Sequence, residues 1–168
     1  HLTTRRQRQM CIRDRRNAYH GSTIGASSLG GMSAMHKQTI GLDYVHHIQQ
    51  PHWFEEGADL DPEAFGIAAA RELERKIDEL GEDRVAAFIA EPVQGAGGVI
   101  VPPESYWPEV KRILDDRDIL LISDEVICGF GRTGNWFGFE TYGIEPDLVT
   151  FAKACLLYTS PSPRDLLK

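Results

Sequence analysis

Three charged residues of the 168-residue chain, Glu91, Asp124 and Lys153, each stand at the end of an apolar run. If these runs are parallel strands, the three side chains meet beyond the carboxyl ends of a sheet, where open α/β sheets bind ligands. Partial desolvation there makes a lysine an amine nucleophile, and a neighbouring aspartate can hold a proton on a pyridine nitrogen. Singly, each acid could cap a turn and the lysine could be solvated. Three in register favour imine chemistry of the kind that pyridoxal phosphate requires.

The apolar runs that lead to these residues have the composition of strands buried on both faces. They cover 84–90, 118–123 and 147–152. Between the first two, residues 105–117 carry the pattern of an amphipathic helix. Alternating strands and helices with buried strands predict an α/β fold with a mainly parallel sheet flanked by helices.

The segment upstream supplies further elements. Residues 61–80 form the clearest predicted helix, with Asp61 as N-cap, Pro62 as the first helical residue and an apolar stripe at helical spacing. Residues 44–51 predict a short strand that ends at a proline. The stretch 22–38 is rich in small residues and predicts a closely packed helix.

The two ends differ in composition from the middle. Residues 1–16 hold six arginines against one acid and show neither helical nor strand periodicity. We expect this segment to be a disordered basic tail or non-native sequence. Residues 155–168 crowd Ser and Pro behind a short apolar run, and we expect the same of them. Residues 17–154 then form the folded part.

The composition excludes several classes of protein. A hydrophobic content of 42% is typical of a globular chain, and a net charge of -7 argues against a nucleic-acid-binding surface. Three widely spaced cysteines indicate a reducing compartment, without a disulfide framework or a C-x-x-C zinc site. The longest apolar run, 85–90, is far shorter than the ~20 residues that span a bilayer. We expect a cytoplasmic protein that binds neither membrane nor nucleic acid.

The stretch GFGRTG, residues 129–134, matches the G-x-G-x-x-G pattern of dinucleotide-binding loops. That fingerprint begins at a strand end and opens an amphipathic helix. Here DEVIC separates the strand from the first glycine, and the following NWFGFETYGIEP has no helical stripe. The pattern therefore favours a tight loop over a nicotinamide oxidoreductase. His46, His47 and His52 could suggest a metal, but no Cys or acid cluster completes a ligand set, and we expect no metal.

Several long stretches resemble the class III (omega) aminotransferases of fold type I: EPVQGAGGVIVPPESYW, LLISDEVICGFGRTGNWFGFE and PDLVTFAK. NAYHGSTIGASSLGG resembles the part of those enzymes that supplies an aromatic ring over the cofactor. The resemblance runs from about residue 17 to 154, and MSAMHKQ and YVHHIQQPHWFEEG look most like the putrescine–pyruvate branch. It implies the central part of a large domain that binds pyridoxal 5′-phosphate.

The resemblance also implies residue roles. Lys153 would be the Schiff-base lysine and proton shuttle, and Asp124 would pair with the protonated pyridine nitrogen. Val126 would pack on one face of the ring, and Tyr19 would stack on the other. The other positions expected to line the site are His20 and Glu91.

The implied activity is transfer of an amino group from a terminal amine, with putrescine as the expected donor, to pyruvate in a homodimeric parent enzyme. Other omega-amino donors, such as β-alanine or 4-aminobutyrate, are an alternative, and a decarboxylase or aminomutase is a lesser one. The family's upstream Gly/Ser phosphate loop, its downstream Thr and its substrate-carboxylate Arg have no counterpart here. We therefore expect a fragment that is incomplete, and inactive, on its own.

Overall fold

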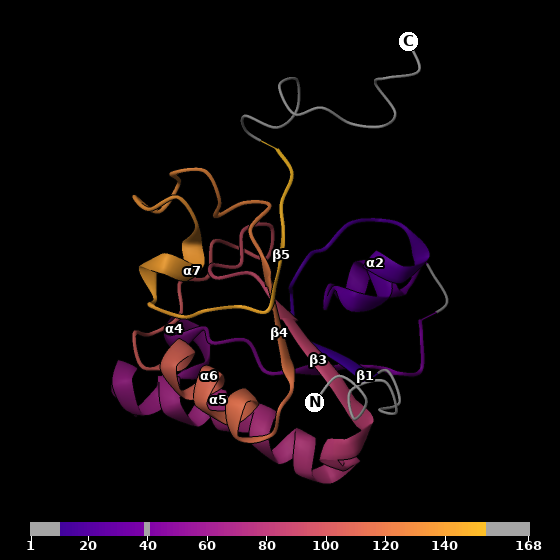
Figure 1. Cartoon of the computed structure of the whole chain (residues 1–168), viewed down its shortest axis with the longest axis horizontal. Coiled ribbons are helices and arrows are strands. Elements are labelled where there is room, and N and C mark those ends of the chain that lie inside the picture. The colour runs from indigo at the N-terminus through magenta and orange to yellow at the C-terminus, as the bar shows by residue number, and fades with distance from the viewer. Residues whose placement is uncertain (1–10, 39–40, 154–168) are drawn as a thin grey trace.

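The computed structural model describes residues 11–38 and 41–153, and the expected tail 155–168 lies outside them. Five strands form one sheet in the order β2-β1-β3-β4-β5, and every neighbouring pair runs parallel (Figure 1). The strands are β1 (Cys11–Arg15), β2 (Val45–Ile48), β3 (Val85–Ala90), β4 (Leu120–Asp124) and β5 (Leu148–Thr150). The predicted parallel α/β fold is therefore confirmed.

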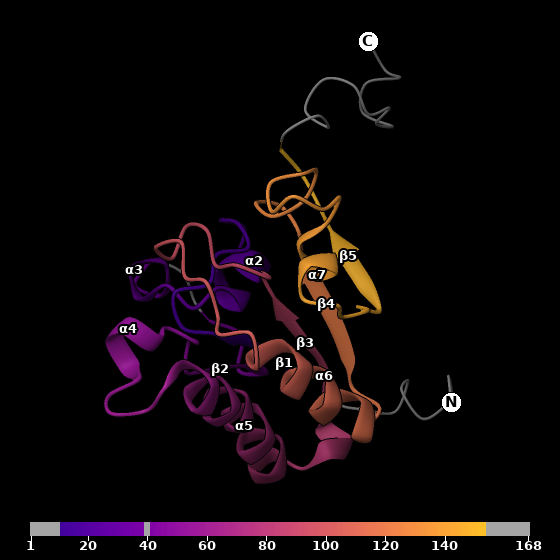
Figure 2. The ribbon, with the colours of Figure 1, turned by 90° about the vertical axis from the view of Figure 1, so that its left-hand side faces the viewer.

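Two long helices, α5 (Pro62–Leu80) and α6 (Tyr106–Asp116), lie side by side against one face of the sheet (Figure 2). Their buried side chains form the core together with those of β3 and β4. The short helix α2 (Ile24–Leu29) lies on the other side of the strands (Figure 1). The chain moves across the sheet in one direction from β1 to β2 and in the opposite direction from β3 to β4. Because both connections are right-handed crossovers, their helices lie on opposite faces of the sheet.

Helix α5 is built as its sequence predicts. The Asp61 side chain accepts a hydrogen bond from the Ala64 amide at 3.0 Å, and Pro62 occupies the first turn. Leu73 and Ile77 of the apolar stripe are fully buried. Gly81 ends the helix with a φ of 89°, a conformation that glycine adopts without a steric penalty.

The stretch 22–38 forms two short helices, α2 and α3 (Ser33–His36), where the sequence predicted one. The break falls at Gly30 and Gly31. A Cβ on Gly31 would lie 2.2 Å from the main-chain oxygen of Arg15, so the chain passes β1 too closely for any side chain. This close approach ends α2 and turns the chain.

The prediction of an unstructured arm over residues 1–16 is wrong at its end, because Cys11–Arg15 form β1 in the middle of the sheet. Arg15 is fully buried. Its Nη2 donates to the Glu91 carbonyl at 2.5 Å, and its guanidinium lies 5.5 Å from the Trp107 ring centre. Residues 1–10 lie outside the described part.

The third predicted strand is shorter and less buried than expected. It covers Leu148–Thr150 in place of 147–152, and Leu148 is 52% exposed. Within the described part of the chain β5 pairs with β4 alone, so one of its edges faces away from the sheet.

The GFGRTG stretch is a loop of turns, as predicted. Phe130, Gly131 and Gly134 have φ values of 61°, 89° and 96°, the left-handed region that glycine favours. The next helix, α7 (Gly138–Thr141), has only four residues. A dinucleotide fingerprint would open a long helix, so the geometry does not support a nicotinamide site. Two further short helices complete the fold, α4 (Trp53–Glu56) and the 3-10 turn η1 (Glu82–Arg84).

Candidate active site

The strand ends bring the predicted charged residues to one edge of the sheet. Asp124 ends β4 opposite Thr150 of β5, and the Glu125 amide donates to the Thr150 carbonyl at 2.8 Å. Glu91 follows β3, the other neighbour of β4. Lys153 comes three residues after Thr150, the last residue of β5.

The Asp124 carboxylate is fixed from two sides. The residue is 4% exposed. Its Oδ1 accepts from the Val126 amide at 3.0 Å, and its Oδ2 lies 2.5 Å from His20 Nδ1. A buried carboxylate needs such partners, since burial of an unpaired charge is strongly unfavourable. The two contacts set the direction in which Asp124 presents its remaining lone pairs.

His20 lies between two carboxylates. Its Nδ1 faces Asp124, and its Nε2 lies 2.8 Å from Asp14 Oδ2. A carboxylate only accepts hydrogen bonds, so both ring nitrogens donate and the imidazole carries a positive charge. Burial alone would lower the pKa of His20. The charge of Asp14, the hydrogen bonds to both aspartates and the charge of Asp124 outweigh burial and raise the pKa to about 10.

Glu91 connects two loops of the site. Its Oε1 accepts from the Tyr19 amide at 3.2 Å, and its Oε2 accepts from the Gly95 amide at 2.8 Å. Burial raises the pKa of Glu91, while these hydrogen bonds and the nearby Arg15 and His20 oppose the rise. Glu91 therefore holds the main chain at Tyr19, a residue that is 36% exposed.

Lys153 and Val126 are placed less tightly. The Lys153 side chain is exposed, so the desolvation that the sequence argument invoked is not provided by the described residues. Its φ of 57° is uncommon for a residue with a Cβ. Val126 is half-buried two residues after Asp124. The structure thus brings Asp124, His20 and Glu91 together and leaves Lys153 at the rim.

Three residues of this region, Asp14 among them, were missed by sequence reasoning. Arg15 supports Glu91 from β1, but it stands among other arginines, which hid it. Glu125 is a fully buried acid next to Asp124. Its position in the acid pair that ends an apolar run was the available signal, because a buried acid there needs hydrogen-bond donors.

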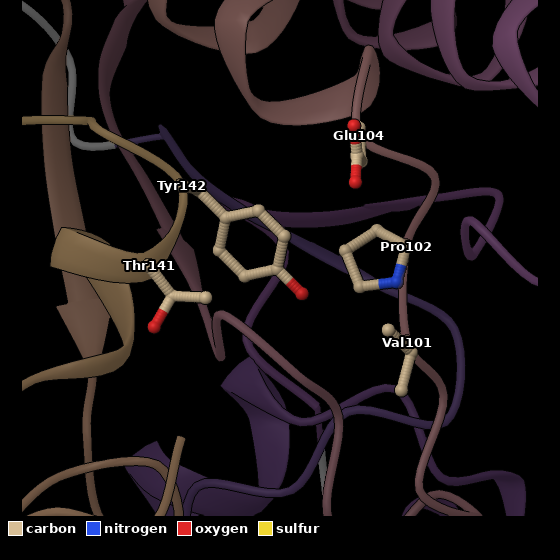
Figure 3. Close-up of a pocket in the computed structure, with 5 residues that line it drawn as sticks. All are labelled: Val101, Pro102, Glu104, Thr141 and Tyr142. Carbon is tan, nitrogen blue, oxygen red and sulfur yellow. The ribbon is translucent and has the colours of Figure 1, made fainter. Parts of the chain in front are cut away.

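Not all of the surface pockets lie at this edge of the sheet. One, of about 500 Å³, lies between α7 and the segment that leads into α6, and Figure 3 shows the Tyr142 ring facing Pro102 across it. None of the predicted site residues lines it. Another, of about 320 Å³, is lined by Gly95, Ile127 and Arg132 among others, and so lies between the loops that follow β3 and β4.

The charge state of His20 gives a testable pH dependence. A pKa raised from 6.5 to about 10 contributes stability that is fully present below pH 6.5 and is lost as the pH rises through about 10. The charged groups that face His20 are Asp14, Asp124 and Glu91. Asp14→Asn should lower the pKa of His20 by about one unit or more, since it removes the charge that raises it most.

An NMR titration of the imidazole in the full chain measures this pKa. The exposed Asp43→Asn is the matched control, because it removes the same charge away from the site. Titration of the unmodified chain near pH 6.5 would contradict the ion pairs.

Comparison with known proteins shows the family of the chain. The family model for class III aminotransferases matches residues 2–156. Over 138 residues the chain is 59% identical to the putrescine–pyruvate aminotransferase of Pseudomonas aeruginosa, covering 82% of this chain and 30% of that protein. It is 49% identical over 143 residues to gamma aminobutyrate transaminase 3, chloroplastic, of Solanum lycopersicum, covering 83% of this chain and 27% of that protein.

Among solved structures, an (S)-enantioselective omega-transaminase from Thermomicrobium roseum superposes with a TM-score of 0.82 at 48% identity. The match covers 84% of this chain and 32% of that one. Among the described residues, no helix has both the length and the apolar composition needed to cross a membrane.

Proposed function

The chain belongs to the class III aminotransferases, and we propose that it acts within a longer enzyme that transfers an amino group from putrescine to pyruvate. It spans about 30% of the length of the curated relatives that it matches. The observation that carries the proposal is the buried Asp124 carboxylate, oriented by His20 and by the Val126 amide, at the end of the strand beside the one that leads to Lys153.

The residues at this edge fit pyridoxal 5′-phosphate by their chemistry. A carboxylate ends one strand, a primary amine follows the next, and an aromatic residue lies on a loop that Glu91 ties to the same edge. When bound, pyridoxal phosphate supplies two groups: an aldehyde, which reacts with the amine, and an electron-withdrawing ring. Asp124, Lys153, Val126 and Tyr19 would hold it.

Each residue then has a defined task. Asp124 would accept a hydrogen bond from the protonated ring nitrogen, and the imidazolium of His20 holds the Asp124 carboxylate in a fixed orientation. Lys153 would hold the cofactor through its amine and would move the proton at the amine-bearing carbon of the donor. Such transfer by a positioned base accelerates a reaction by ~100- to 10,000-fold. Glu91 fixes the main chain of Tyr19, and Tyr19 and Val126 pack against the ring.

The identity of the donor rests on similarity. Support for putrescine and pyruvate comes from the relative at 59% identity, and support for 4-aminobutyrate comes from the relative at 49%. The higher identity favours the diamine.

A chimera tests the activity and the donor together. Residues 11–153 replace the matching segment of the Pseudomonas aeruginosa relative, and the product is incubated with pyridoxal phosphate. We expect a visible absorbance band and alanine formation from pyruvate, faster with putrescine than with β-alanine or 4-aminobutyrate. The isolated 168-residue chain is assayed beside it, and we expect it to be inactive. A chimera that folds but shows no band would overturn the aminotransferase proposal, and a faster rate with 4-aminobutyrate would overturn only the choice of donor.

A further inference from the structure

Glu125 is a fully buried carboxylate that uses both of its oxygens. Oε1 accepts from the Phe139 amide at 2.9 Å and from the Ser123 hydroxyl at 3.0 Å. Oε2 accepts from the Gly138 amide at 2.8 Å. The three donors are neutral: two main-chain amides and one hydroxyl. The hydrogen bonds are charge-assisted because the acceptor is a carboxylate, and they stabilise its buried charge.

The main chain of Glu125 is held as firmly as its side chain. Its amide donates to the Thr150 carbonyl of β5 at 2.8 Å, and its carbonyl accepts from the Gly129 amide at 2.8 Å. One residue therefore joins β4, β5, the start of the GFGRTG loop and the first turn of α7. Figure 2 shows α7 beside the end of β4.

The partner segment is itself locked in place. A Cβ on Gly138 would lie 2.7 Å from Cys128 Cβ and 2.9 Å from Pro92 Cβ, so the start of α7 is pressed against the loop that follows Glu91. The Glu125 side chain thus connects the end of β4 to a segment that can hardly shift.

The residues on either side of Glu125 are Asp124 and Val126, which carry the proposed contacts to the ring. We propose that Glu125 is a positioning residue that fixes the Asp124–Val126 turn by holding the Gly138 and Phe139 amides. The effect on the reaction rests on the proposed function, whereas the hydrogen bonds can be tested without the cofactor.

Glu125→Gln in the chimera is the first test. The amide keeps the shape of the side chain, but its nitrogen cannot accept the hydrogen bond from one of the two backbone amides. Hydrogen exchange at Gly138 or Phe139 should accelerate about tenfold or more in the cofactor-free protein, since a bond to a charged acceptor is lost. The pH midpoint of the visible band of the loaded protein should move by about half a unit or more. Glu145→Gln, which removes an exposed charge after α7, should change neither.

Ser123→Ala keeps the proposal testable if the glutamine variant does not fold. It removes one donor to Oε1 and leaves both backbone amides bonded, so a smaller shift of the midpoint in the same direction is expected. Faster hydrogen exchange together with an unchanged pH midpoint of the visible band would show that Glu125 has only a structural role, and would overturn the proposal. An unmodified chimera without a band refutes the proposed function, and the positioning role with it. A chimera with a band that neither variant shifts refutes the positioning role alone.

Discussion

Lys153→Ala is expected to abolish the visible band of the cofactor-loaded chimera and to lower the rate of amino-group transfer by at least ~100- to 10,000-fold. Alanine removes both the amine that would hold the cofactor and the base that would move the proton. No neighbouring group replaces it in the proposal, because the side chains of the other charged residues of this edge, Asp124, Glu91 and His20, are engaged in hydrogen bonds.

Absorbance spectroscopy and single-turnover kinetics with putrescine and pyruvate measure the two effects. Lys111→Ala is the matched control, since Lys111 forms a surface ion pair with Asp115 on α6, and such pairs contribute little to stability. A Lys153→Ala protein that keeps its band and most of its rate would show that another amine performs this chemistry.

Asp124→Asn should reduce the rate of transfer by about 100- to 1,000-fold, a loss comparable to removing a preorganised electrostatic partner from a catalytic site. Asparagine can still accept from the Val126 amide, so the turn should persist. It cannot offer a negative charge to the protonated ring nitrogen, and its NH₂ group has no acceptor on an imidazolium at His20.

The expected signature of Asp124→Asn is a lower kcat with a cofactor band that remains but titrates at a different pH. Asp59→Asn on the exposed surface serves as control. His20→Gln should show a weaker effect of the same kind. The double variant should lose less than the two single effects combined, because the residues act through one contact. Unchanged kcat in Asp124→Asn would remove the aspartate from the proposed mechanism.

The sequence was sufficient for the parts of the fold that are specified locally. Helix α5 has its cap, its first proline and its apolar stripe in one window, and the observed bounds agree with the prediction. The buried strands β3 and β4 were visible as continuous apolar runs. Because parallel strands end at the same edge, the meeting of Glu91 and Asp124 followed from their positions. The catalytic roles of Asp124 and Lys153 stay predictions.

What the sequence could not give depends on contacts between distant segments. The contact between His20 and Asp124 joins residues 104 positions apart, and the charge of His20 depends on it. The role of Glu125 depends on amides from a loop that turns back thirteen residues later. Strand β1 was missed because its polar residues carry no strand pattern. The low burial of β5 was missed because the apolar composition of a strand does not indicate whether it pairs with another strand on each side.

The central position of β1 has a wider consequence. Ile12 and Arg13 are paired with β2 on one side and with β3 on the other. Those pairings use main-chain groups, which every residue type except proline can offer. At Ile12 and Arg13 the position between two parallel strands therefore requires an extended backbone, whereas Asp14 and Arg15 also contribute buried side chains that contact His20 and Glu91. Strand β1 thus both delivers the chain that follows, with Tyr19 and His20, and supplies two of the side chains that hold this edge of the sheet.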